Sequence, residues 1–229
     1  CIRDRHYGFS YFTACQEILN SNLCTNAFAI DTWEGDKHAG ILDNSVFEYV
    51  VEHNKKYDSF SKLLKTTFDD ALGYFDDSSI ELLHIDGLHT YNAVKHDFES
   101  WLPKVSSRGV ILLHDINVHR EDFGVNEFWR ELKLNFHNFE FNHSYGLGVI
   151  VLDPRLHKFP LNSLSNFTNE QRNEFVGAIN SHAAEMMGRF INQSTVLQKK
   201  LELALFEKDE IVNSTIWKST YPVSYTHLR

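Results

Sequence analysis

Four residues that can bind metal ions or move protons stand at the ends of two apolar runs. Asp86 follows the run IELLHI, with His89 three residues later, and the run GVILLHD ends in His114 and Asp115. Carboxylates and imidazoles bind divalent cations such as Mg²⁺, and two or three such ligands leave positions open for a substrate oxygen. Imidazole also exchanges protons near neutral pH. The predicted metal ligands are Asp86, His114 and Asp115, and the predicted catalytic residues are His89 and Asp86.

Each of these residues also has a purely structural explanation. Aspartate is a common N-cap and turn former, so Asp86 and Asp115 could simply begin the segments that follow them. His89 could satisfy polar groups of a turn, and His114 could pack at the edge of a sheet. We favour a site because three apolar runs end in aspartate, the third of them at Asp31.

Asp31 has the spacing of a nucleotide-binding carboxylate. In nucleotide-binding α/β domains, a carboxylate about twenty residues after a glycine turn accepts hydrogen bonds from ribose hydroxyls. Gly8, in the stretch HYGFSYF, lies 23 residues before Asp31 and opens a segment of helical character. Asp31 is therefore a candidate ribose ligand.

Segments typical of strands and of helices alternate over residues 6–155. The expected strands are NAFAID, FSKLLK, IELLHID, GVILLHD, FEF and GLGVIVLD, and SSRG is expected to be a turn. The expected helices are SVFEYVVEHNKKY, FDDALGYF, TYNAVKHDFESWL and VNEFWRELK. This alternation predicts a doubly wound α/β domain, with a mostly parallel sheet and helices on both faces. Ligands of such folds bind at the carboxyl ends of the strands, where the three aspartates would lie.

Composition excludes some classes of partner. The 229-residue chain has a formal net charge of −9, which argues against non-specific nucleic-acid binding because phosphates require a basic face. No stretch approaches the ~18 consecutive apolar residues of a membrane span. There is no secretory signal pattern, and the cysteines lack zinc-type or redox-type spacing. We expect a cytoplasmic protein.

The C-terminal part has a different pattern. From 168 to 212 an apolar residue recurs every seven positions, at Val176, Ala183, Phe190, Leu197, Ala204 and Ile211. This spacing predicts a long amphipathic helix after a linker at 156–167. Such a helix could form a coiled coil that joins copies of the chain into a homo-oligomer, or it could pack back on its own domain.

Four stretches carry a resemblance to a known family: HYGFSYF, AIDTWEGDKHAG, LLHIDGLHTYNAVKHDFESWLPKVSSRGVILLHDINV and FGVNEFWRELK. Together they resemble a class I S-adenosylmethionine-dependent methyltransferase, specifically methyltransferase domain family 24, related to the cephalosporin-hydroxylase and rhamnosyl O-methyltransferase group. The resemblance covers residues 6 to about 152 and is most specific around 80–125. It implies a Rossmann-like domain that transfers a methyl group to an oxygen, commonly a hydroxyl of a sugar or natural product.

The resemblance also implies roles for individual residues. Gly8 and Ser10 fall in the glycine turn around the methionine part of the cofactor. Asp31 falls on the position that binds the ribose hydroxyls, with Thr32 and Trp33 close to the adenosine. At the reaction centre, Asp86 falls on a position that contacts both the cofactor and the metal, and His114 and Asp115 fall on the remaining metal positions. His89 falls on the position where catechol-type relatives carry a catalytic lysine.

The two ends of the chain depart from the family. Residues 1–5, CIRDR, stand where the family has an apolar strand and a first glycine, and VSYTHLR at 223–229 is equally out of keeping. We expect residues 1–5 to be non-native, and we expect the same of the last residues of a tail that spans 213–229. The stretch IVNSTIWKSTYP resembles a segment that leads toward a glycosyltransferase domain in multidomain bacterial polysaccharide proteins. That resemblance implies a glycan acceptor and a longer natural chain.

Three functions remain in competition at this point. The leading hypothesis is a metal-assisted O-methyltransferase that acts on a hydroxyl of a sugar, glycan or related small molecule. The second is a catalytically silent scaffold domain of a glycan-assembly protein, and the third is a metal-dependent hydrolase that uses the Asp86 cluster alone. Asp31 and the loop DTWEGD favour the first hypothesis over the hydrolase, since a hydrolase needs no ribose-binding carboxylate.

Overall fold

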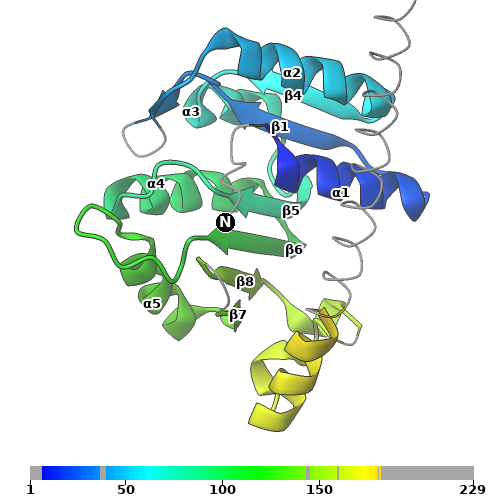
Figure 1. Cartoon of the computed structure of the whole chain (residues 1–229). Coiled ribbons are helices and arrows are strands. Elements are labelled where there is room, and N and C mark those ends of the chain that lie inside the picture. The colour runs from blue at the N-terminus through cyan, green and yellow to red at the C-terminus, as the bar shows by residue number, and fades with distance from the viewer. Residues whose placement is uncertain (1–6, 37–39, 143–144, 159, 180, 182–229) are drawn as a thin grey trace, which may run out of the picture. The chain divides into compact units, whose positions relative to one another are not determined.

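The computed structural model describes residues 7–36, 40–142, 145–158, 160–179 and 181. The chain divides into two units, Cys1–Asn166 and Phe167–Arg229. In the first unit, strands and helices alternate (Figure 1). The strands are β1 (Ala27–Asp31), β2 (Gly35–Asp36), β3 (Gly40–Ile41), β4 (Ser61–Lys65), β5 (Ile80–Ile85), β6 (Val105–His114), β7 (His137–Phe141) and β8 (Leu147–Val151). The α-helices are α1 (Phe9–Asn20), α2 (Asn44–Asn54), α3 (Phe68–Ala71), α4 (Tyr91–Trp101) and α5 (Val125–Asn135).

Two pairs of parallel strands form the framework. β1 pairs with β4, and β5 pairs with β6 in a sheet of order β5-β6-β8-β7. The helices α2 and α4 make the crossovers within these pairs, as parallel strands require. β8 runs antiparallel to both β6 and β7. This arrangement confirms the predicted α/β class, although within the described residues the strands form separate sheets rather than one continuous sheet.

The prediction of a turn at SSRG is wrong, because these residues lie inside β6. The pairing of β6 with β5 is irregular there: Ile80 lies opposite Val105, and Leu82 lies opposite Val110. β6 therefore advances five residues while β5 advances two. The extra residues form a bulge, and a bulge accommodates residues of turn-like composition such as SSRG within a strand.

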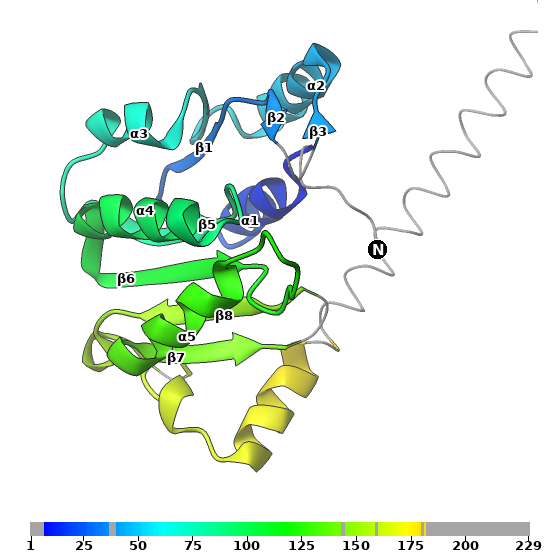
Figure 2. The ribbon, with the colours of Figure 1, turned by 90° about the vertical axis from the view of Figure 1, so that its left-hand side faces the viewer.

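The four-stranded sheet and its helices share one core. Val94, Phe98 and Trp101, three of the apolar residues spaced along α4, are buried. Figure 2 shows α4 and α5 lying along the same side of the sheet. The core between them and the sheet comprises Ile85, Val94, Phe98, Val105, Ile111, Leu113, Ile116, Val125, Phe128, Trp129, Leu132 and Ile150. Burial of these side chains fixes the ends of β5 and β6 relative to α4 and α5.

A second core lies around β1. Phe12 and Cys15 of α1 pack with Val46 and Val50 of α2, and Trp33 closes the cluster. Asp43 caps α2, because its Oδ1 accepts a hydrogen bond of 2.8 Å from the backbone N–H of Ser45. This second core positions the carboxyl end of β1.

The described part of the second unit is helical over residues 169–179 and at 181. The rest of the helix predicted over 168–212 lies outside the described residues, as do the tail at 213–229 and the residues 1–5. Among the described residues, no helix has the length and apolar character needed to cross a membrane.

Candidate active site

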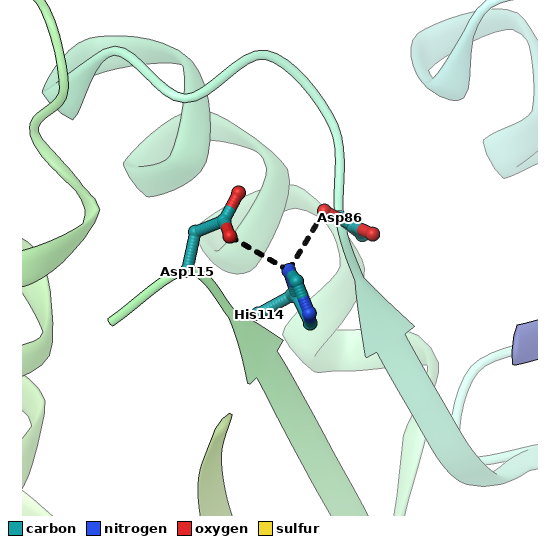
Figure 3. Close-up of side chains that lie close together, drawn as sticks. All are labelled: Asp86, His114 and Asp115. Atoms are coloured by element: carbon teal, nitrogen blue, oxygen red, sulfur yellow. Dashed lines mark ion pairs between the residues drawn. The ribbon is translucent and has the colours of Figure 1, made fainter. Parts of the chain in front are cut away.

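The carboxyl ends of β5 and β6 bring the predicted metal ligands together. These strands are parallel, and Ile85 lies opposite Leu113. The next residue on each strand is therefore Asp86 on one side and His114 on the other, followed by Asp115. Figure 3 shows the three side chains converging from the two strand ends.

The distances within this cluster suit a divalent cation. The ligand atoms of Asp86, His114 and Asp115 all lie within 4.8 Å of one another. Nδ1 of His114 is 2.9 Å from Oδ1 of Asp115 and 3.5 Å from Oδ1 of Asp86. Atoms that bind one cation at about 2.1–2.4 Å lie at most about 4.8 Å apart, so the residues fit a bound ion. A donor set of two oxygens and one nitrogen suits Mn²⁺ or Zn²⁺ as well as Mg²⁺.

Asp115 is held in an unusual backbone conformation. Its φ is 64°, in the left-handed region, and its side chain is fully buried. Its backbone N–H donates to the carbonyl of Gly146 at 3.1 Å, and its carbonyl accepts from the N–H of Val118 at 3.1 Å. Aspartate tolerates this conformation better than most residues. The chain thus turns sharply at the end of β6 and keeps the carboxylate inside the cluster.

His89 joins the same cluster from the loop between β5 and α4. Its Nε2 lies 2.9 Å from Oδ2 of Asp115 and 3.5 Å from Oδ1 of Asp86. The residue is only 6% exposed, because its ring stacks on Phe123 with centroids 4.8 Å apart and planes 9° apart. Thr90 follows it and caps α4 through its Oγ1, which accepts from the N–H of Ala93.

The residues predicted for the methionine end of the cofactor lie at the start of α1. Gly8 precedes the helix with a φ of 75°. A Cβ there would lie 2.9 Å from the ring of Phe12, so both the backbone and the space require glycine. Ser10 is exposed in the first turn of the helix.

The residues predicted for the adenosine end lie at the last residue of β1 and directly after it. Asp31 is exposed, and its Oδ1 accepts a hydrogen bond of 2.7 Å from the backbone N–H of Trp33. Thr32 is partly buried. Trp33 is 5% exposed, has a φ of 52°, and packs on Phe47 with ring centroids 4.7 Å apart. Its side chain thus belongs to the core around β1, and its backbone orients Asp31.

Sequence reasoning missed the residues that cover His89. Phe123 stacks on its ring, and the guanidinium of Arg120 lies 5.4 Å from the Phe123 ring centroid. Gly124 donates its N–H to the carbonyl of His89 at 2.8 Å. The dipeptide Phe-Gly before α5 suggests a turn, but nothing in the local sequence indicates contact with a residue more than thirty positions earlier.

Comparison with known protein families identifies the domain that contains this cluster. Residues 5–116 match a family described as a methyltransferase domain. This part of the chain belongs to that methyltransferase family. The matched segment contains both predicted cofactor stretches and ends one residue beyond Asp115. It gives no support to the hydrolase alternative.

One relative and two solved structures illustrate the similarity. The uncharacterized protein y4gI of Sinorhizobium fredii is 40% identical over 199 residues, which are 87% of this chain and 22% of that protein. The chain thus spans about a fifth of the length of the relative it matches.

A Staphylococcus aureus protein described as a candidate caffeoyl-CoA O-methyltransferase is 14% identical, with a TM-score of 0.45, over 66% of this chain and 85% of that one. The SAH-bound methyltransferase PaMTH1 of Podospora anserina is 14% identical, with a TM-score of 0.42, over 63% of this chain and 76% of that one.

Proposed function

We propose that this chain transfers the methyl group of S-adenosylmethionine to the oxygen of a hydroxyl group, with help from a divalent cation. The observation that supports this proposal most directly is the cluster of Asp86, His114 and Asp115 at two parallel strand ends, inside a methyltransferase domain. Open α/β folds bind their ligands at this edge.

The reaction exchanges one bond for another. The bond between the methyl carbon and the sulfonium sulfur breaks, a carbon–oxygen bond forms, and the hydroxyl proton is released. The products are a methyl ether and S-adenosylhomocysteine. A bound divalent cation supplies the Lewis acidity that lowers the pKa of a hydroxyl. The protein contributes much of the remaining acceleration by orienting the acceptor oxygen in line with the methyl group.

Each cluster residue has a distinct part in this proposal. Asp86 has a side chain that is 24% exposed; in this proposal its carboxylate, which can take up a proton, faces the acceptor and accepts the hydroxyl proton on its way to solvent. His114, 29% exposed, and the fully buried Asp115 complete the ligand set. Two carboxylates close together repel each other, and a cation between them offsets that repulsion.

The cofactor lies across the two cores in this proposal. Asp31 accepts hydrogen bonds from the ribose hydroxyls, since its carboxylate is exposed at the end of β1. Gly8 and Ser10 line the methionine end, where a side chain at Gly8 would occupy space now filled by the Phe12 ring. Thr32 lies next to the adenosine, and Trp33 shapes the loop through its N–H bond to Asp31.

The acceptor class is a finer part of the proposal. We infer a sugar or glycan hydroxyl from the resemblance of residues 211–222 to a segment of polysaccharide proteins. A cytoplasmic location, association through residues 168–212 and a glycosyltransferase domain in a longer natural chain belong to the same proposal.

Two measurements test this function. The first is calorimetric titration of S-adenosylmethionine into the chain, with Asp31→Ala as the comparison; equal affinity of the two would remove the role of Asp31. The second is transfer of isotopically labelled methyl groups to sugars and to catechols, with and without a chelator. We expect transfer to sugars that the chelator suppresses and Mn²⁺ or Mg²⁺ restores. Equal transfer in the presence of the chelator would refute the metal assignment.

A further inference from the structure

The two oxygens of Asp115 contact two different imidazoles. Oδ1 lies 2.9 Å from Nδ1 of His114, and Oδ2 lies 2.9 Å from Nε2 of His89. A contact to one carboxylate oxygen restricts rotation of the whole group. His89 therefore determines the direction in which Asp115 presents its other oxygen to the cluster.

His89 is itself held in place from the other side. Its ring lies parallel to that of Phe123, and Arg120 lies over the same phenyl ring. Only 6% of the residue is exposed, so an acceptor molecule has little access to the imidazole. A general base must come within hydrogen-bond reach of the proton that it removes. The burial of His89 favours another role.

Hydrogen bonds hold the loop that carries Phe123 near both of its ends. It begins at Asp115, and near its end Gly124 donates a hydrogen bond to the His89 carbonyl. Nδ2 of Asn126 donates to the carbonyl of Ile116 at 2.6 Å, which ties the beginning of the loop to α5. The loop thus leaves the cluster at one ligand and returns over the residue that contacts that ligand.

We propose that His89 is a positioning residue, which Phe123 holds so that Asp115 is oriented as a metal ligand. This proposal rests on the metal-assisted function proposed above, and it replaces the predicted role of His89 as a catalytic base. Residues that orient metal ligands from behind typically change metal affinity by about 10- to 100-fold when they are altered.

The test is the affinity of the whole chain for Mn²⁺ alone, measured by electron paramagnetic resonance of the free ion. We expect Phe123→Leu to weaken binding about 10-fold, because the leucine cannot stack on the imidazole. Phe75→Leu is the matched control: Phe75 is also partly buried, and its ring packs on Phe28 and Trp101 instead.

Two substitutions of His89 separate positioning from proton transfer. His89→Gln keeps a donor that can reach Asp115, and we expect near-normal Mn²⁺ affinity. His89→Leu removes the donor, and we expect a loss at least as large as that of Phe123→Leu. A general base would show the opposite pattern, with unchanged Mn²⁺ affinity in both variants and loss of methyl transfer in His89→Gln, since glutamine cannot take up a proton near neutral pH.

The outcomes distinguish the positioning role of His89 from the metal-assisted function on which it rests. If the unaltered chain does not bind Mn²⁺, the metal-assisted function fails and the positioning role fails with it. If the unaltered chain binds Mn²⁺ and Phe123→Leu binds it as tightly as Phe75→Leu does, only the positioning role is refuted. Should His89→Leu fail to fold, the comparison of the two phenylalanine variants still decides.

Discussion

The loop over the cluster leaves no room for a side chain at Gly124, which makes Gly124→Ala a sharp test of the structure. A Cβ at this position would lie 2.2 Å from the backbone nitrogen, 2.3 Å from Cβ and 2.4 Å from Cα of Tyr91. These atoms begin α4, so no side-chain rotation can relieve the contact. The start of α4 or the loop must retreat by roughly 1 Å to reach ordinary van der Waals distances.

The cost follows from two terms. Overpacking a well-packed site costs about 1–3 kcal/mol, and the upper part of that range applies where backbone atoms must move. The movement also strains the hydrogen bond from Gly124 to the His89 carbonyl, which contributes about 1 kcal/mol. We expect Gly124→Ala to lower the free energy of unfolding by about 3 kcal/mol, or the melting temperature by about 6–12 °C for a chain of this length.

The measurement is urea unfolding, which compares the free energies of unfolding of Gly124→Ala and Gly73→Ala. Gly73 is exposed, and a Cβ there would meet no atom within 4 Å. Gly73→Ala should therefore stabilise the chain by about 0.4–1 kcal/mol, since alanine restricts the unfolded chain more than glycine does. Equal stability of the two variants would show that the loop does not pack on α4 as described.

Three further predictions concern individual carboxylates. Asp31→Ala should weaken binding of S-adenosylmethionine roughly 10-fold or more in calorimetry, through loss of a hydrogen-bonding charge. Asp115→Asn should weaken Mn²⁺ binding by at least about 10-fold but leave binding of the cofactor unchanged, because asparagine keeps the left-handed backbone and loses the charge. Burial raises the pKa of Asp97 from 3.8 to about 6; the nearby His96 opposes this shift, and Asp69 adds a smaller contribution to it. The folded chain therefore binds more protons than the unfolded chain between these values, and stability from this group falls as pH rises from about 4 to 6. At pH 7.5 the free energy of unfolding of Asp97→Asn should exceed that of the unaltered chain by roughly 1–3 kcal/mol, and this difference should disappear near pH 4. A difference of the same size at both pH values would contradict the prediction.

The amino-acid sequence predicted the elements that carry the site, because local patterns determine them. The apolar runs before Asp86 and Asp115 have the length and composition of strands, and strands separated by helices of these lengths pair in parallel. Their carboxyl ends then meet at one edge. The convergence of Asp86, His114 and Asp115 follows from that topology alone.

The exceptions have long-range causes. SSRG has the composition of a turn, yet Val105 before it and Val110 after it both pair with β5, which keeps SSRG within β6 as a bulge. Trp33 has its own case of such a cause: its place near the adenosine stays a prediction, and its indole packs on Phe47 in the core around β1. Both outcomes depend on neighbours that are distant in the sequence, which composition and periodicity do not report.

What the sequence by itself determined is which residue types stand at the strand ends, and thus the class of chemistry. Only the tertiary structure decided which atoms of those residues face one another. His89 and Phe123 are 34 positions apart, and the stack between them exists only because the loop after β6 folds back over the start of α4. Packing of that loop converted a histidine with the spacing of a catalytic base into a buried partner of Asp115. A side chain's chemistry comes from its type, but its role is set by what covers it.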